Sequence, residues 1–232
     1  DGILGRNCDD IDITTSATPE EIFSLFPRTV PTGIKHGTIT VIIDEHSIEV
    51  TTFRQEFGYK DSRHPDEVVF VSNLEDDLSR RDFTINALAC DENGEIIDIF
   101  NGLRDLKVGI IKAVGEPEKR FEEDALRIVR AYRFASVLGF KIDESTRNAA
   151  IKLSSKINGI SGERLLGELK KAACGKQPAA ICELISTGVF KEFGLISQAY
   201  SNEIFNRLSR IDIAPTSMLA ILLTLCRHDT EL

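Results

Sequence analysis

Apolar and polar residues alternate in short runs along the first half of the chain, a pattern typical of β-strands. Two runs rich in β-branched residues, 38–43 and 47–53, flank a polar turn at 44–46 and predict a β-hairpin. The sequence Ile-Asp-Ile at 11–13 predicts a further strand, whose two isoleucines should enter the core while the aspartate points to the other face. The first half is therefore expected to contain a small sheet.

Helices are expected around these strands. Residues 18–21 read Thr-Pro-Glu-Glu, a capping box with proline at the first helical position, which predicts a helix that runs to Phe26. The polar stretch 54–67 predicts a long irregular loop, and such loops in compact domains are often functional. Beyond it, the sequence predicts a helix containing residues 80–89 and a strand over 96–100.

From Pro117 onward the pattern is helical almost without interruption. Residues 123–133 repeat apolar positions at helical spacing, which predicts one helix with a buried stripe: Ala125, Ile128, Val129 and Tyr132. Gly139 is expected to end that helix, and Asp143 and Ser161 to cap the next two. The change of pattern near residue 115 predicts a domain boundary.

Composition is that of a globular protein: of 232 residues, 42% are hydrophobic and 28% are charged. No run of about 18 apolar residues is present, which argues against a membrane span. The net charge of -9 argues against a positively charged surface over the whole protein but not against a local basic patch.

The five scattered cysteines favour reduced thiols in a cytoplasmic protein. Because the chain begins with Asp1, we expect an interior fragment of a longer protein.

Carboxylates gather at the first predicted strand. Asp10 and Asp12 are two residues apart, so in a strand both side chains point to one face. Glu49 is the single charged residue of the run 47–53 and could complete a cradle of three carboxylates. Carboxylates held together repel one another unless a cation joins them, and oxygen ligands suit Mg²⁺ that bridges substrate phosphates. The alternative is an acidic surface turn with Glu49 on the solvent face.

Arg81, Asp82 and Asn86 form a second candidate site. In the predicted helix, Asp82 and Asn86 are at i and i+4 on one face, a suitable reach for sugar hydroxyls. Arg81 could meet phosphate oxygens. The alternative is an ordinary helix start with an ion pair.

The third candidate is the segment 123–133. In a helix, Asp124 and Arg127 are side-chain neighbours, Arg130 follows one turn on, and Arg133 has rotated away from Asp124. A carboxylate beside a guanidinium can accept from an exocyclic amine and donate to the adjacent ring acceptor, an edge that cytosine and adenine share and that guanine and uracil lack. The pair predicts a reader of C or A, and the alternative is a solvated helix with i,i+3 ion pairs.

Together these segments resemble the class II tRNA nucleotidyltransferases and bacterial poly(A) polymerases, within the DNA polymerase β-like nucleotidyltransferases. The resemblance extends over residues 1–175 and includes these motifs in the family's order: Leu4-Gly5-Arg6, Asp10-Ile11-Asp12, Lys35 to Thr38, Ile48 to Arg54, Arg63-His64-Pro65, Arg80 to Ala87, Asp98 to Leu106, Glu123 to Phe134 and Gly162-Glu163-Arg164. It implies an α+β fold with three parts: a polymerase β-like head with a small mixed sheet and helices (1–114), an all-helical neck that reads the base and binds RNA (115–175), and the start of a helical body (176–232).

The resemblance also implies roles for the candidate residues. Asp10 and Asp12 match the family's Mg²⁺-binding carboxylates, and Glu49 matches the third acidic position of the catalytic sheet. The implied nucleotide-binding residues come from the other two candidate sites: Arg81, Asp82, Asn86, Asp124, Arg127, Arg130 and Arg133. For Arg133 this assignment depends on the resemblance alone.

The chain departs from the family at its start. The family's Gly-Gly-x-Val-Arg-Asp element precedes the D-x-D, and this sequence begins with the last residue of that element, Asp1. The glycines and the arginine that would cradle the triphosphate are absent, so an inactive fragment of an active parent is one expectation.

The implied function is template-independent addition of C, C and A to tRNA 3′ ends from CTP and ATP, with release of pyrophosphate. Its rivals within the family are A-adding enzymes and poly(A) polymerases, and the loop from Glu56 to Val69 resembles the CCA-adding or A-adding forms more than the CC-adding ones. A rival of another class is a non-catalytic RNA-binding module. The predicted carboxylate cradle argues against that rival, because clustered negative charges would repel an RNA phosphate.

Overall fold

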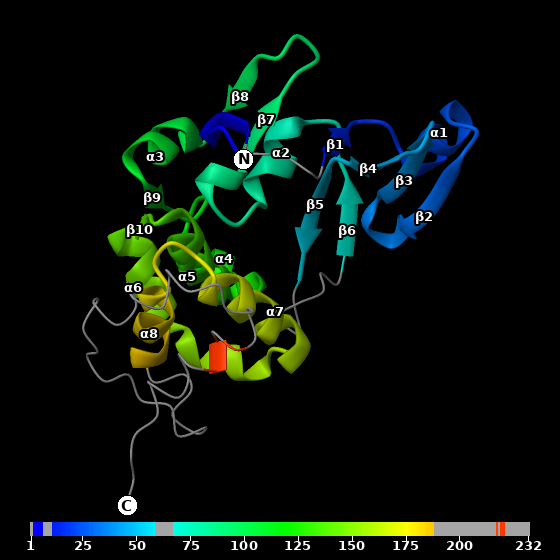
Figure 1. Cartoon of the computed structure of the whole chain (residues 1–232). Helices are drawn as coiled ribbons and strands as arrows, with labels where there is room; N and C mark the ends of the chain where they lie inside the picture. Colours follow the sequence, from blue (N-terminus) through cyan, green and yellow to red (C-terminus); the bar gives the residue numbers. More distant parts are fainter. Residues whose placement is uncertain (1, 7–10, 59–66, 188–216, 218, 221–232) are drawn as a thin grey trace, which may run out of the picture. The chain divides into compact units, whose positions relative to one another are not determined.

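The computed structural model describes the following residues of the chain: 2–6, 11–58, 67–187, 217 and 219–220 (Figure 1). Asp10 and the Arg63-His64-Pro65 motif lie outside them. The chain divides into two compact units, of which the first holds residues 1–60 and 65–80 and the second holds 61–64 and 81–232. Both contain helices and strands, so the α+β class is confirmed. The three functional parts, 1–114, 115–175 and 176–232, stay a prediction.

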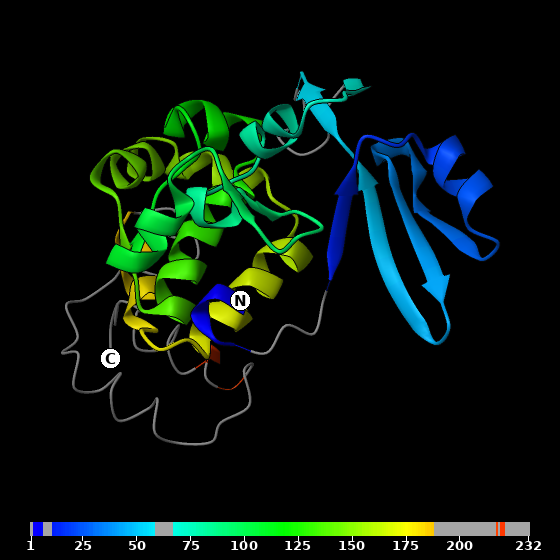
Figure 2. The same cartoon turned by 90° about the horizontal axis from the view of Figure 1, so that it is seen from above.

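The first unit is built on a four-stranded sheet, which Figure 2 shows in shades of blue, with the order β1-β4-β3-β2. Its strands have these bounds: β1 Asp12–Thr15, β2 Thr29–Gly33, β3 Thr38–Ile43 and β4 His46–Thr52. Strands β3 and β4 form the predicted hairpin, and Asp44 in its turn has a left-handed φ of 53°. Strand β1 pairs with β4 in parallel.

Helix α1, Pro19–Leu25, provides the apolar cover of this sheet. The Thr18 hydroxyl accepts from the Glu21 backbone N–H and the Glu21 carboxylate accepts from the Thr18 N–H, so the predicted capping box is confirmed. Ile22 of the helix is buried with the inner residues of the sheet: Ile39, Val41 and Val50. This cluster is the core of the first unit.

The prediction that Ile11 and Ile13 enter the core is wrong. Their side chains are 66% and 44% exposed. Strand β1 stands at the end of the described strand order, and α1 packs mainly on β3. The helix therefore leaves Ile13 exposed, although its register partner Val50 is buried.

Residues 54–57 were expected in an irregular loop, but β5, Arg54–Phe57, pairs with β6, Glu67–Phe70, in an antiparallel ribbon. Helix α2, Leu74–Ser79, follows. The short 3₁₀ helices η1, Gly2–Leu4, and η2, Ile34–His36, complete the first unit.

The predicted helix over 80–89 is also wrong. This segment contains a turn, the 3₁₀ helix η3, Thr84–Asn86, and strand β7, Leu88–Cys90. Phe83 is fully buried and forms a β-bridge with Ala113, and the Thr84 N–H donates to the Lys112 carbonyl. Backbone pairing with a distant segment therefore replaces the local helix.

The second unit is mostly helical, and helix α5 packs against α4, α7 and α8 (Figure 1). Its helices have these bounds: α3 Gly102–Val108, α4 Pro117–Glu123, α5 Leu126–Leu138, α6 Glu144–Lys152, η4 Ser154–Gly159, α7 Gly162–Ala173 and α8 Ala179–Ser186. Its further strands are β8 Ile96–Asp98, β9 Ile110–Ile111 and β10 Lys141–Ile142. None of the helices in the described part of the chain has the length and apolar character that a membrane span requires.

The predicted apolar stripe forms the centre of this unit's core. Its four residues are each no more than 1% exposed. Gly139 ends α5 in the left-handed conformation, and the Asp143 carboxylate accepts from the Thr146 N–H, as predicted. Ser161 is the N-cap of α7, but its side chain makes no capping hydrogen bond.

Candidate functional site

Asp12 and Glu49 are register partners on the adjacent parallel strands β1 and β4. Because partners in register direct their side chains to the same face of a sheet, the two carboxylates share one face. Thr40 of β3 is the register partner of Glu49 on its other side. The apolar core with Ile39 and Val50 lies on the opposite face. The hairpin thus produces one polar, acidic face and one buried face.

Both described carboxylates of this face are exposed, and Asp10 lies outside the described residues. Among the described residues, no group of three His, Cys, Asp or Glu side chains could hold a metal ion. The two carboxylates on this face, Asp12 and Glu49, offer only oxygen atoms as metal ligands. Such donors fit a hard divalent cation better than zinc or copper.

Asp82 is the centre of the second predicted site and is 8% exposed. Its Oδ1 accepts from the Phe83 N–H at 2.8 Å and from Asn86 Nδ2 at 2.9 Å, and its Oδ2 accepts from Arg130 Nε at 2.7 Å. Asp82 and Asn86 lie close together, as expected for residues on one face, but a turn and a 3₁₀ helix rather than the predicted α-helix bring them together. Arg81, which precedes them, is partly buried. The carboxylate therefore binds segment 81–87 to helix α5.

The third predicted site is divided between two helices. Helix α4 ends at Glu123, and Asp124 has an extended backbone with φ -144° and ψ 108°. The Asp124 carboxylate accepts from the Leu126 N–H at 3.0 Å. An aspartate that accepts from the backbone two residues onward favours a helix start over a helix interior. The prediction of one continuous helix over 123–133 is therefore wrong.

This break gives the two predicted base readers different partners. The Asp124 carboxylate lies 2.7 Å from Arg164 Nη2 on α7, and Arg127 Nη1 lies 2.8 Å from the Glu123 carboxylate. Burial raises the pKa of the Glu123 carboxyl, and the nearby guanidiniums of Arg120 and Arg127 oppose this shift. The side chains of Asp124 and Arg127 are thus fixed separately.

Arg130 and Arg133 are held by carboxylates and by an aromatic ring. Arg130 Nη1 lies 3.7 Å from Glu168 of α7, and Arg133 forms an ion pair with the same carboxylate. The guanidinium carbons of Arg133 and Arg130 lie 3.6 and 5.3 Å from the centre of the Phe134 ring. Burial lowers the pKa of Arg133, and the Glu168 carboxylate opposes this shift.

The sequence analysis named Arg164 within the motif Gly162-Glu163-Arg164 but did not predict its ion pair with Asp124, and it did not name Glu168. Arg164 and Glu168 are four residues apart in α7, so they lie on the same side of that helix. The spacing of four residues indicates in the sequence that Arg164 and Glu168 act on one side of the helix. The spacing does not identify their partners, because Asp124 and Arg133 are more than 30 residues away in the sequence.

Two family models match the sequence. The "Poly A polymerase head domain" matches residues 1–112, and the "Probable RNA and SrmB-binding site of polymerase A" matches residues 139–194. The relatives include CCA-adding enzymes of Lactobacillus helveticus, 54% identical over 175 residues, and Leuconostoc mesenteroides, 50% identical over 184 residues. These alignments cover 75% and 79% of this chain, but 44% and 46% of the relatives. The chain spans about half the length of the curated relatives it matches.

Solved structures with a similar fold also come from CCA-adding enzymes. The Bacillus stearothermophilus CCA-adding enzyme in complex with CTP is 45% identical with a TM-score of 0.74, and the alignment covers 82% of this chain and 46% of that one. The Thermotoga maritima CCA-adding enzyme complexed with tRNA is 27% identical with a TM-score of 0.68, and the alignment covers 90% of this chain and 50% of that one. The motifs, the fold and these matches lead to one conclusion: the chain belongs to the family of CCA-adding enzymes and poly(A) polymerases.

Proposed function

We propose that the protein carrying this chain adds C, C and A to the 3′ end of tRNA, using CTP and ATP and releasing pyrophosphate. The observation that carries the proposal is the register of Asp12 and Glu49 on one exposed face of the sheet. Relatives named CCA-adding enzymes support the choice of reaction. A cytoplasmic location is part of the proposal, because both tRNA and nucleoside triphosphates are present there.

Asp10, Asp12 and Glu49 would hold a divalent cation, which we propose to be Mg²⁺. When bound, such a cation lowers the pKa of an attacking hydroxyl and stabilises the charge on the leaving pyrophosphate. The sheet holds the two carboxylates in place relative to each other, because Asp12 and Glu49 are on neighbouring paired strands.

Nucleotide binding is assigned to the second unit. Arg81 carries positive charge for the triphosphate, while Asp82 and Asn86 offer hydrogen bonds to the ribose. Arg130 and Arg133 are assigned to nucleotide binding as later members of the motif that contains Asp124 and Arg127. Because Asp82 already accepts from Arg130, a sugar hydroxyl must share or replace that hydrogen bond.

The choice of base is assigned to Asp124 and Arg127. Asp124 would accept from the exocyclic amine of cytosine or adenine, and Arg127 would donate to the adjacent ring acceptor. Arg164 and Glu123 fix these two side chains before a nucleotide arrives. A base with the opposite edge would leave both groups without matching hydrogen bonds.

The test uses a tRNA that ends at the discriminator base. Each nucleoside triphosphate is supplied alone, then CTP with ATP, and product length is read at single-nucleotide resolution. Two additions with CTP and three with the pair are expected. A long tail with ATP alone would indicate a poly(A) polymerase, a single A added only to a tRNA that ends in CC would indicate an A-adding enzyme, and no incorporation would favour a non-catalytic RNA-binding module.

A further inference from the structure

Arg130 lies between two carboxylates that come from different segments of the second unit. Its Nε and Nη2 atoms each lie 2.7 Å from Oδ2 of Asp82, whereas its Nη1 atom lies 3.7 Å from Oε1 of Glu168. The first two contacts have hydrogen-bond length, and the third is just too long for a hydrogen bond. One guanidinium therefore has a close carboxylate partner and a second carboxylate nearby.

The Asp82 carboxylate is already saturated by the described residues around it. A carboxylate offers about four acceptor sites to hydrogen-bond donors. Oδ1 of Asp82 accepts from the Phe83 N–H and from Asn86 Nδ2. Oδ2 is contacted by the two Arg130 nitrogens. A further donor, such as a sugar hydroxyl, can bind Asp82 only if one of these contacts breaks.

A contact with Arg130 is the one that can be exchanged. Phe83 and Asn86 belong to the same short segment as Asp82, and Phe83 is fully buried, so breaking their contacts would disturb the local backbone. The long Arg130 side chain has several rotatable bonds and is 31% exposed, so it can move without a backbone change. Its charge still needs a partner, because a largely buried charge without one is costly.

Glu168 can provide that partner. Its side chain is 12% exposed, its Oε2 pairs with Arg133, and its Oε1 is the oxygen near Arg130. A shift of about 1 Å would bring Arg130 Nη1 to the length of a charge-assisted hydrogen bond with this oxygen. Arg130 would then bridge the two carboxylates, with one contact to Asp82 released.

We propose that Glu168 is a positioning residue for sugar recognition: when a ribose hydroxyl donates to Asp82, Arg130 releases one of its two contacts there and gains one with Glu168. The inference rests on the proposed function, because it adopts Asp82 as the residue that binds the ribose. Glu168 does not touch the nucleotide. It lowers the cost of the exchange, and it therefore sets how strongly the protein prefers a nucleotide with the hydroxyl over one without it.

The test measures the binding of CTP, 2′-deoxy-CTP and 3′-deoxy-CTP to the 232-residue chain. Glu168→Gln removes the negative charge that receives Arg130. Glu168→Asp is the second variant, because it keeps the charge but has a shorter side chain that lies further from Arg130. It tests the exchange even if Glu168→Gln does not fold.

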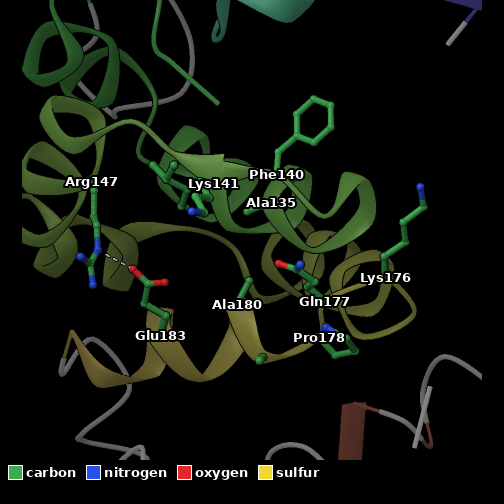
Figure 3. Close-up of a pocket in the computed structure, with 11 residues that line it drawn as sticks. Ala135, Phe140, Lys141, Arg147, Lys176, Gln177, Pro178, Ala180 and Glu183 are labelled. Atoms are coloured by element: carbon green, nitrogen blue, oxygen red, sulfur yellow. Dashed lines mark hydrogen bonds and ion pairs between the residues drawn. The ribbon is translucent and has the colours of Figure 1, made fainter. Parts of the chain in front are cut away.

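Glu183→Gln is the matched control. Glu183 also pairs with an arginine, since its Oε1 lies 2.5 Å from Nε of Arg147 (Figure 3). This pair lines a cavity that neither Asp82 nor Glu168 lines, so the same substitution there should leave sugar recognition unchanged. Circular dichroism verifies the folded fraction, and affinities are compared at a temperature at which each variant is folded.

The unaltered chain should bind CTP about tenfold more tightly than the analogue that lacks the recognised hydroxyl. Both Glu168 variants should lose most of this preference, because CTP binds more weakly while the binding of that analogue changes little. A purely structural role would weaken the binding of all three nucleotides equally.

Four outcomes would overturn the proposal. They are equal weakening of all three nucleotides, an unchanged preference in the Glu168 variants, the same loss of preference in Glu183→Gln, and no preference for CTP over either analogue in the unaltered chain.

Because this assay needs no catalysis, it separates the two proposals. A sugar preference that depends on Glu168, without nucleotide incorporation, would reject CCA addition and retain the role of Glu168. Incorporation with a sugar preference that the Glu168 variants leave unchanged would retain CCA addition and reject that role.

Discussion

The carboxylate of Asp82 lies 2.7 Å from the guanidinium of Arg130, which is 48 residues further along the chain. Arg130 also approaches Glu168, which forms an ion pair with Arg133. Two carboxylates from separate segments therefore hold two arginines of one helix, with Phe134 against both guanidiniums. This network links the predicted nucleotide-binding segments before any nucleotide is bound.

Glu168→Gln should lower the free energy of unfolding by about 3 kcal/mol, because it removes the carboxylate from a largely buried pair and leaves Arg133 without its counter-charge. Chemical denaturation measures the loss. Glu118→Gln is the control, because Glu118 forms an exposed ion pair with Lys152 and should contribute at most about 1 kcal/mol. Equal effects of the two variants would contradict the structural role of Glu168.

Asp12→Asn should reduce nucleotide incorporation by about a thousandfold or more while tRNA binding stays nearly unchanged, because a metal-binding carboxylate acts on the reacting phosphate rather than on the RNA. Single-turnover incorporation and a separate binding assay measure the two effects. Asp44→Asn in the hairpin turn is the matched control, since asparagine tolerates the left-handed backbone there. Unchanged incorporation by Asp12→Asn would reject the metal assignment.

Asp124→Ala should relax the choice of base more than it weakens triphosphate binding. Arg164→Met should have the same effect to a smaller degree, because Arg164 fixes the Asp124 carboxylate. A base-reading contact provides about 1 to 3 kcal/mol of discrimination, so the preference for CTP over UTP should fall about tenfold in Asp124→Ala. Lys171→Met on the same helix is the control, and an unaltered preference in Asp124→Ala would rule out edge recognition by this residue.

Gly37→Ala should destabilise the first unit by about 2 kcal/mol or more. Gly37 has a φ of +75°, and an added Cβ would lie 2.7 Å from Phe70 Cε1 and 3.2 Å from Thr52 Cβ. Gly94→Ala tests the strain alone, because Gly94 has a φ of +83° and nothing within 4 Å of an added Cβ. Thermal unfolding of both variants is measured. Gly94→Ala reports the cost of backbone strain alone, and Gly37→Ala reports the cost of strain plus steric overlap with Phe70 and Thr52. Similar decreases in stability would show that the steric overlap contributes nothing.

Tyr132 should make stability fall at high pH. Burial raises the pKa of its hydroxyl to about 12, with a further contribution from Glu183 that Arg147 opposes. The unfolded chain, with a tyrosine pKa of about 10, releases this proton first, so the stabilisation is complete below about pH 10 and is lost as pH rises toward about 12.

Tyr132→Phe should remove this pH dependence. At neutral pH it should cost little, because the hydroxyl has no hydrogen-bond partner among the described residues. Urea unfolding across the alkaline range measures both effects. A parallel decline in the variant and the unaltered chain would show that other groups cause the loss.

Much of the local structure could be predicted. The hairpin over 38–52, the capping box at Thr18 and the apolar stripe of α5 each depend on neighbours within a few residues. Two of the predictions that were wrong have a cause outside the local sequence. Segment 80–89 pairs with residues 112–114. Ile13 is exposed because α1 packs mainly on β3. Neither contact can be predicted from the neighbouring residues in the sequence.

The sequence by itself determined which residues could carry the chemistry, because carboxylates, arginines and glycines keep their chemical character in any fold. It placed Asp12 and Glu49 on predicted strands, and it placed Asp124 and the arginines in one motif. The parallel pairing of those two strands came from the structure. Only the tertiary structure decided their partners: Arg164 with Asp124, Arg130 with Asp82, and Glu168 with Arg133. These pairs join residues that are 35 to 48 positions apart, and their contact depends on how complete helices pack against one another.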